Sequence, residues 1–302
     1  MKFGVNAWVW VSPCDTEALK KLAPTVKQMG FDMIEVPLEG IGDLDYKTGA
    51  QIIKDSGLGV STCAAMGPDR DLIHSDPAIR ENGLNYIRQA IDATHLLGGT
   101  NLVGPIYSAV GRVWQQSADD RAKDVDLLVT NLSTLARYAA DKGVVLGIEP
   151  LNRFETNFLN RHDQAIRLAQ DVGGNVGICL DAFHINIEEA DPYAAITTAG
   201  KGGWLVDFHV ADNNRFPPGS GNLDWAKTIS TLKAAGYDNQ LTVEFVVPLD
   251  RSPLATKAEE AGTTATEAEL KFIRDHGSDL MSDAAYSKYV EDSIKHLRAS
   301  GA

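Results

Sequence analysis

Four acidic or imidazole side chains recur at a nearly constant interval along the second half of the chain. Asp181 lies 32 residues after Glu149, His209 a further 28 residues on and Glu244 a further 35. Each stands at the end of a short β-rich run. Three carboxylates and a neutral imidazole in one dry site would repel each other and take up a proton unless a cation lay between them. The set therefore predicts a metal site, and its oxygen-rich ligands favour Mn²⁺, with Co²⁺ or Mg²⁺ as alternatives.

The alternation of side chains within each run supports this grouping, because residues two apart on a strand share a face. In the run that contains His209, the rule places Val206, Phe208 and Val210 on the outer face. Asp207 and His209 then face inward. In the other three runs the inward row also ends in a carboxylate. The four groups are thus expected at one end of one sheet.

Two further inward residues have plainer interpretations. Asp207 is best read as the buried polar partner of another group, although a carboxylate so near His209 could also support its imidazole. Cys179 is expected to pack in the core, because no neighbouring residue in the sequence indicates an activated thiol.

The elements that would position these residues are eight β-rich runs separated by amphipathic stretches. The runs are 3–10, 32–37, 59–64, 100–105, 144–150, 176–181, 204–210 and 241–245. Segment 76–98 has helical spacing, and Asp76 and Pro77 suit its N-cap and first position. Alternating strands and helices indicate a parallel sheet, and eight units in about 250 residues match a (β/α)₈ TIM barrel. An open doubly wound sheet is the rival, but the first strand lacks a glycine-rich phosphate turn.

One segment departs from this rhythm. Residues 248–285 form a long polar stretch before a last amphipathic helix at 285–300. We predict that 1–302 is a single α/β domain, a TIM barrel with an insertion between strand 8 and the last helix. The insertion would lie over or beside the active face, or would be a linker with no role.

Composition excludes several classes of protein. The chain of 302 residues has 28 Lys and Arg against 41 Asp and Glu, a net charge of −13, which disfavours a nucleic-acid partner. No apolar run reaches the roughly 18 residues of a membrane span, and the start lacks the features of a signal peptide. Cys14, Cys63 and Cys179 show no paired spacing, which fits reduced thiols. A soluble cytoplasmic protein is expected.

Several motifs carry a resemblance to a known family. They are EPLNRFE (149–155), DAFH (181–184), HVADNNRFPPGSG (209–221), VEF (243–245) and GPIYSAVGR (104–112). Together they resemble the D-tagatose 3-epimerase and D-allulose (D-psicose) 3-epimerase family, within the xylose isomerase-like group of sugar-phosphate isomerase and epimerase barrels. The likeness covers about residues 3–247. It implies a metal-dependent isomerase that epimerises free ketoses at C3, and a homodimer or homotetramer.

The resemblance also assigns roles to individual residues. It makes the four residues described first the metal ligands. It implies that Glu155, His184 and Arg215 hold the substrate at its C1–C3 oxygens and that Trp114 lines the sugar pocket. In such a reaction two carboxylates on opposite sides of C3 remove and return a proton, while the ion stabilises the enediolate. Glu149 and Glu244 would be these catalytic residues.

Other functions stay open at this stage. The long segment 248–285 suggests a larger substrate, so an isomerase or lyase of 3-keto glycosides, like the C-glycoside deglycosidases, is the main alternative. Inosose isomerase or dehydratase activity is another. A xylose isomerase is disfavoured because Leu151 stands where its motif has Lys, and an endonuclease IV would need more His ligands and a basic face. A non-catalytic sugar-binding protein would not need carboxylates on both sides of the sugar.

Overall fold

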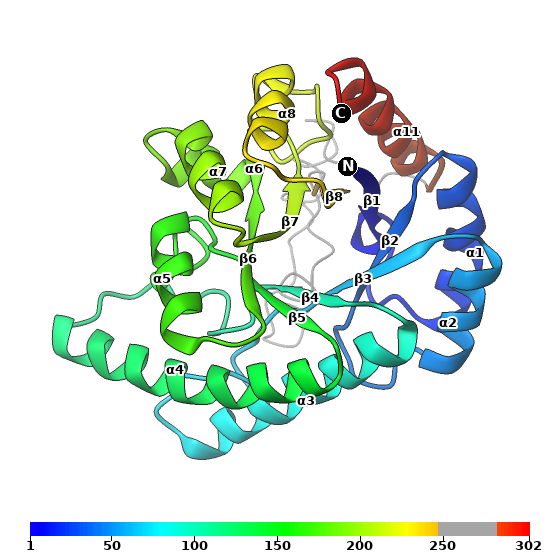
Figure 1. Cartoon of the computed structure of the whole chain (residues 1–302). Helices are drawn as coiled ribbons and strands as arrows, with labels where there is room; N and C mark the ends of the chain where they lie inside the picture. The colour runs from blue at the N-terminus through cyan, green and yellow to red at the C-terminus, as the bar shows by residue number, and fades with distance from the viewer. Residues whose placement is uncertain (247–282) are drawn as a thin grey trace, which may run out of the picture.

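A computed structural model describes residues 1–246 and 283–302 of the chain. Over these residues eight parallel strands close into a barrel in chain order, with β1 paired to β8 (Figure 1). The TIM-barrel prediction is confirmed. The strands are β1 (Lys2–Asn6), β2 (Met33–Pro37), β3 (Gly59–Cys63), β4 (Asn101–Gly104), β5 (Val145–Ile148), β6 (Val176–Asp181), β7 (Leu205–Val210) and β8 (Gln240–Val243). The predicted insertion, 248–285, falls almost entirely outside the described residues.

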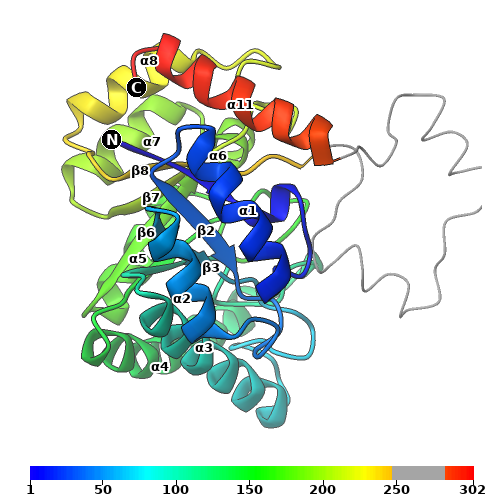
Figure 2. The same ribbon diagram turned by 90° about the vertical axis from the view of Figure 1, so that its right-hand side faces the viewer.

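Helices surround the barrel, and Figure 2 shows α1 and α2 in front of the strands on one side. The helices are η1 (Ala7–Val9), α1 (Thr16–Gln28), α2 (Tyr46–Asp55), α3 (Pro77–Leu97), α4 (Ala118–Asp141), α5 (His162–Val172), α6 (Ala182–Glu188), α7 (Pro192–Lys201), α8 (Trp225–Ala234) and α11 (Asp283–Ala299). As predicted, Asp76 caps α3, since its carboxylate accepts the N–H of Ala78 at 2.8 Å. No described helix has the length and apolar character of a membrane span.

The first strand is shorter than the apolar run 3–10 predicted. The side chain of Asn6 accepts a hydrogen bond from the backbone N–H of Trp8 at 2.9 Å, and η1 begins there. A short polar side chain that bonds to its own backbone offers an alternative to the sheet ladder. The chain therefore leaves β1 at Asn6. Further on, Trp10 Nε1 donates to Ser287 Oγ of α11 at 3.1 Å.

Two apolar layers hold the barrel together. The outer layer fills the space between strands and helices, and it contains the residues predicted to point outward, among them Phe208 and Val210. The inner layer is a small cluster of Cys63, Val103 and Cys179. Cys179 is thus a buried core residue, as predicted.

The alternation rule placed Val206 on the outer face of the barrel, and this prediction is wrong. The register between β6 and β7 shifts at this point. Ile178 pairs with Leu205 and Cys179 pairs with Asp207, so Val206 has no partner on β6 and is an extra residue of β7. An extra residue in one strand is a β-bulge, which resets the side-chain phase. Val206 therefore packs against the interior cluster instead of the helices. Beyond the bulge the alternation resumes, so the inward row still ends in the predicted imidazole.

Gly104, the last residue of β4, lies in close contact with neighbouring backbone. Its φ is +124°, and a Cβ built on it would lie 2.3 Å from the carbonyl oxygen of Ala64. Its own carbonyl oxygen accepts the backbone N–H of Glu149 at 3.1 Å. Only glycine fits this position without strain.

Gly104→Ala is expected to lower the free energy of unfolding by about 2–5 kcal/mol, from left-handed strain and a backbone clash. Gly98→Ala is the matched control, because Gly98 has a φ of +87° but no atom within 4 Å of a built Cβ. There we expect a loss of about 1–2 kcal/mol. Urea denaturation compares the two variants, and equal losses would contradict a clash at Gly104.

Candidate active site

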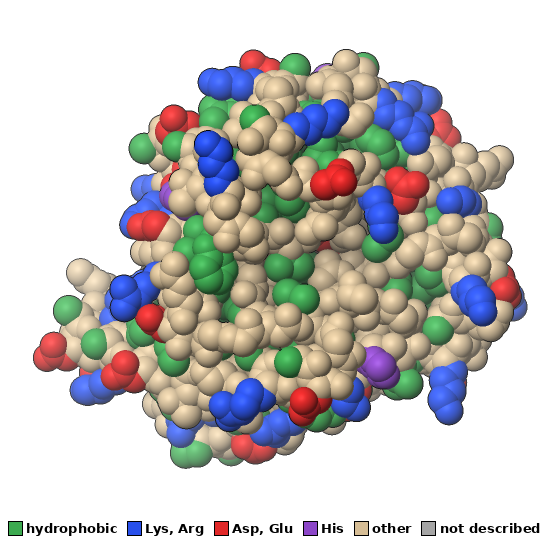
Figure 3. Space-filling model, in the orientation of Figure 1, with side chains coloured by type: hydrophobic (Ala, Val, Ile, Leu, Met, Phe, Trp, Pro, Cys, Tyr) green, Lys and Arg blue, Asp and Glu red, His purple; other side chains and the backbone are tan. Residues whose placement is uncertain are grey.

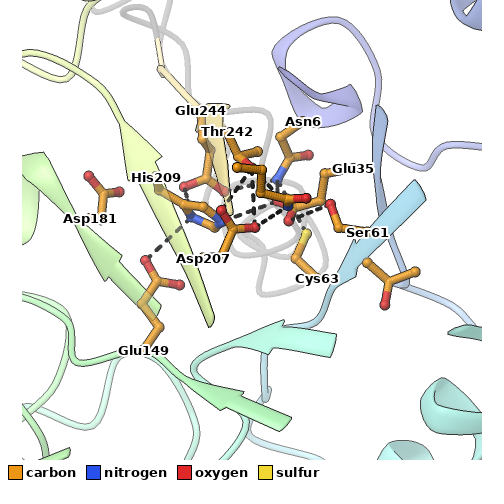
Figure 4. A network of polar contacts seen from close by, with 12 residues as sticks. Asn6, Glu35, Ser61, Cys63, Glu149, Asp181, Asp207, His209, Thr242 and Glu244 are labelled. Carbon is orange, nitrogen blue, oxygen red and sulfur yellow. Dashed lines mark hydrogen bonds and ion pairs between the residues drawn. The ribbon is translucent and has the colours of Figure 1, made fainter. Parts of the chain in front are cut away.

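The structure brings the four predicted ligand residues together at the C-terminal end of the barrel strands. Glu149 follows β5, Asp181 ends β6, His209 lies near the end of β7 and Glu244 follows β8. One ligand-type atom from each lies within 4.8 Å of the others (Figure 4). All four side chains are buried. This end of the barrel is where TIM-barrel enzymes carry out their chemistry.

His209 stands at the centre of the cluster. Its Nδ1 lies 3.2 Å from Glu244 Oε2 and 3.7 Å from Glu149 Oε1. Burial alone would lower the pKa of His209, but the acidic groups around it, with Cys179 and Glu35 foremost, raise that pKa well above its ordinary value. The imidazole therefore sits in a strongly negative environment.

The environments of the two glutamates differ. Burial raises the pKa of Glu149 to about 7, although His209 opposes the shift. Burial also acts to raise the pKa of Glu244, but His209 and Arg215 outweigh it and bring that pKa to about 2. Two carboxylates whose pKa values are driven apart can share the roles of acid and base at one pH.

The chemistry of the cluster fits a divalent cation. Glu149 Oε1 is buried and receives no hydrogen bond from the residues that the structure describes. A buried acceptor without a donor costs roughly 1–3 kcal/mol, which a coordinated cation would remove. Arg215 contacts Asp181 and Glu244, the latter at 3.0 Å, whereas no contact among the described residues joins its guanidinium to Glu149. Oxygen donors with one imidazole suit ions of the Mn²⁺ and Mg²⁺ type.

His184, in the first turn of α6, points a hydrogen-bond donor at this cluster. Its Nδ1 lies 3.2 Å from the backbone N–H of Asn152, which can only donate. Burial lowers the pKa of His184 well below its ordinary value, so the ring is neutral. Its hydrogen must then lie on Nε2, which is 4.0 Å from Glu149 Oε1.

Asn152 is a site residue that the sequence analysis missed. Its side-chain Nδ2 donates to Glu155 Oε1 at 2.6 Å and lies 3.0 Å from His184 Nδ1. It therefore joins two of the residues that the resemblance placed on the substrate. Burial raises the pKa of Glu155, although the nearby Arg215 lowers it. Asn152 lies in the loop after β5, where no strand periodicity could single it out, and only its place in the EPLNRFE motif marked it.

The other two predicted substrate residues are placed differently. Arg215 has a left-handed backbone with φ +62°, and its guanidinium lies 4.9 Å from the ring of Phe183. Its contacts with Asp181 and Glu244 put it at the cluster. Trp114, between β4 and α4, is 57% exposed. Its side chain and backbone contact Arg112 and Asn157, and neither contact joins it to the cluster within the described part of the chain.

Asp207 has the role of a buried polar partner, which was the preferred interpretation. Its carboxylate accepts hydrogen bonds from Thr242 Oγ1 at 3.0 Å and from Gln240 Nε2. Burial, and then the charge of Glu35, raise the pKa of Asp207 to about 8. Glu35 on β2 was also missed. It stands between the outward-facing Ile34 and Val36, so the alternation rule would have found it if applied to that strand.

A closed parallel barrel with a buried carboxylate–imidazole cluster at this end is the architecture of a TIM-barrel enzyme with a cation site. Comparison with known proteins gives the family. A family model described as xylose isomerase-like TIM barrel matches residues 24–276. The L-ribulose 3-epimerase of Mesorhizobium japonicum is 31% identical over 245 residues, which are 80% of each chain. The chain belongs to the xylose isomerase-like TIM-barrel family, in its ketose 3-epimerase branch, and is an isomerase-class carbohydrate epimerase.

Two further relatives are informative about substrates. The crystal structure of the D-allulose 3-epimerase from Methylomonas sp. in complex with D-allulose has a TM-score of 0.78 and 27% identity, covering 91% of this chain and 96% of that one. The 3-dehydro-D-guloside 4-epimerase of Escherichia coli is 31% identical over 226 residues, 72% of this chain and 84% of that protein.

Proposed function

We propose that this chain epimerises free ketoses at C3, with a divalent metal held by Glu149, Asp181, His209 and Glu244. Mn²⁺ is the preferred ion, with Co²⁺ or Mg²⁺ as alternatives. The observation that carries the proposal is the convergence of four buried ligand atoms within 4.8 Å, from four consecutive strands. The relatives named for L-ribulose and D-allulose support a free ketose of the D-tagatose, D-allulose or D-fructose type.

Glu149 and Glu244 would move the proton. The C3–H of a ketose is acidified by the C2 carbonyl, and inversion at C3 needs removal on one face and delivery on the other. Without the ion, burial raises the pKa of Glu149 to about 7, whereas His209 and Arg215 outweigh burial and bring that of Glu244 to about 2, so Glu149 releases its proton less readily than Glu244. One glutamate would take the C3 proton as the base while the other delivers a proton as the acid, and the roles would exchange in the reverse direction. The bound ion would supply electrostatic stabilisation of the negative charge that develops on the sugar oxygens.

Three residues would orient the sugar. The neutral His184 presents its Nε2–H for a substrate oxygen. Arg215 would donate to the O1–O2 edge, and Glu155 would accept from the C1 hydroxyl. Asn152 would keep His184 and Glu155 in register, because it contacts both. We also propose that Trp114 lines the sugar pocket.

A 3-keto glycoside is the second candidate substrate. The E. coli relative named for 3-dehydro-D-guloside supports it at 31% identity. The same metal site and carboxylate pair would serve, because the proton removed again lies beside a carbonyl.

Comparison of the two substrate classes tests the proposal. With Mn²⁺ added, we expect kcat/KM for the best of D-tagatose, D-allulose and D-fructose to exceed that for a 3-keto glycoside by about tenfold or more, the size of a modest pocket preference. Chromatography follows both products. The ratio is the quantity to compare, since inactive protein cancels in it. Turnover of the glycoside alone would overturn the free-ketose assignment.

We further propose a cytoplasmic homodimer or homotetramer without a nucleic-acid partner. Cys14, Cys63 and Cys179 are buried and form no disulfide, which supports a reducing compartment. On the face seen in Figure 3, Lys and Arg are interspersed with Asp and Glu rather than gathered in one basic patch. The resemblance to the ketose 3-epimerases supports the oligomer, which light scattering would measure.

A further inference from the structure

Two buried polar residues contact the ligand cluster from strands that contribute no ligand. Asn6 ends β1 and Glu35 lies within β2, and both are 0% exposed. Asn6 Nδ2 donates to Glu35 Oε2 at 2.9 Å and to Glu244 Oε1 at 3.1 Å. Glu35 Oε2 also lies 3.3 Å from His209 Nε2. Figure 4 shows the resulting continuous chain from His209 through Glu35 and Asn6 to Glu244.

The contacts around Glu35 suit a carboxylate. Three donor groups face its two oxygens: Asn6 Nδ2, His209 Nε2 and Ser61 Oγ, the last at 3.2 Å. A carboxylate accepts from all three. An amide could still accept from Asn6 and His209 and donate its NH₂ to the Ser61 hydroxyl, which can also accept, so only a side chain without an acceptor removes these contacts. Burial of a carboxyl group raises the free energy of the folded protein unless hydrogen-bond partners are present.

The two ring nitrogens of His209 face different groups. Nδ1 faces Glu149 and Glu244, and Nε2 faces Glu35. Nε2 is buried and has no fully aligned hydrogen bond to a residue that the structure describes, so Glu35 is an acceptor in reach for its hydrogen. A ring that gives the Nδ1 lone pair to a metal must carry its hydrogen on Nε2, and an outer carboxylate commonly fixes that tautomer.

We propose that Glu35 is a positioning residue that holds His209 with Nδ1 toward the metal. Asn6 fixes Glu35 and Glu244 relative to each other. This inference rests on the metal site of the proposed function. The proposal gives β1 and β2 a role in a site whose proposed ligands all lie at the ends of β5 to β8.

Calorimetric titration of Mn²⁺ into the metal-stripped full-length protein tests it. Glu35→Leu, which leaves His209 Nε2 without an acceptor, is expected to weaken Mn²⁺ binding about 10–100-fold, the usual loss when an outer partner of a ligand histidine is removed. Ser61→Ala is the matched control, since it removes one donor to Glu35 but leaves the contacts with His209 and Asn6. Its dissociation constant should stay within about threefold of the unsubstituted protein. If Glu35→Leu does not fold, Asn6→Ala serves, with an expected loss of about tenfold.

Two further variants separate positioning from charge. Glu35→Asp keeps the charge but withdraws the carboxylate from Nε2, so positioning predicts a clear loss and a pure charge effect predicts none. In a His209→Gln background, Glu35→Leu should add little, because its effect acts through the imidazole. Unchanged Mn²⁺ binding in folded Glu35→Leu, full affinity in Glu35→Asp, or additive losses would each overturn the inference. Failure of the unsubstituted protein to bind Mn²⁺ would instead overturn the proposed metal site.

Discussion

Replacement of Glu149 or Glu244 by glutamine is expected to lower kcat for a ketose at least about 10²–10⁴-fold, since each change removes a proton-transfer group. Loss of a ligand charge should add to the effect. An amide keeps the size of each side chain but neither accepts nor returns the C3 proton. Steady-state assays at saturating ketose and saturating Mn²⁺ measure the change.

Asp181→Asn is the control that separates proton transfer from metal binding. Asp181 belongs to the ligand cluster but has no proposed part in proton transfer. Its variant should recover much of its activity as the Mn²⁺ concentration rises, whereas the two glutamine variants should not. A glutamine variant with recovery equal to that of Asp181→Asn would show that its carboxylate serves only as a ligand.

Exhaustive chelation is expected to abolish turnover, and added Mn²⁺ or Co²⁺ to restore it. The physical reasons are the mutual repulsion of three carboxylates and the buried oxygen of Glu149, to which no described residue donates. The metal should also raise the thermal midpoint, because a ligand at 100 times its dissociation constant stabilises by about 2.7 kcal/mol.

Metal analysis, activity and thermal unfolding of the same samples make this test. Turnover undiminished in protein shown to be free of metal would contradict the metal-dependent mechanism. A rise in thermal midpoint with Mn²⁺ but no restored turnover would leave the ion a structural role only.

The grouping of the four candidate ligands was predictable from the sequence because strands have a strict period of two and successive units have similar lengths. Those two regularities are enough to place Glu149, Asp181, His209 and Glu244 at one end of the barrel. The same rule would have reached Glu35. The β-bulge at Val206 was not predictable, since it depends on how β6 and β7 pair.

Residues outside the strands needed other signals. Asn152 lies in the same loop as Glu155, and its contact with His184 joins this loop to α6, a pairing that no strand periodicity predicts. The end of β1 depends on one side-chain hydrogen bond of Asn6, within a run that otherwise looks like an uninterrupted strand. The prediction for 248–285 lies almost entirely outside the described residues, and its role stays a prediction.

The central claim is that a proton leaves C3 of the ketose and another is returned on the opposite face. Incubation of the Mn²⁺-loaded protein with D-tagatose or D-allulose in D₂O tests it most directly, with the epimeric product examined by NMR. Exchange of the carboxyl proton with solvent should place deuterium at C3 of the product. An epimeric product with no solvent deuterium at C3, formed at a normal rate, would contradict proton transfer through Glu149 and Glu244.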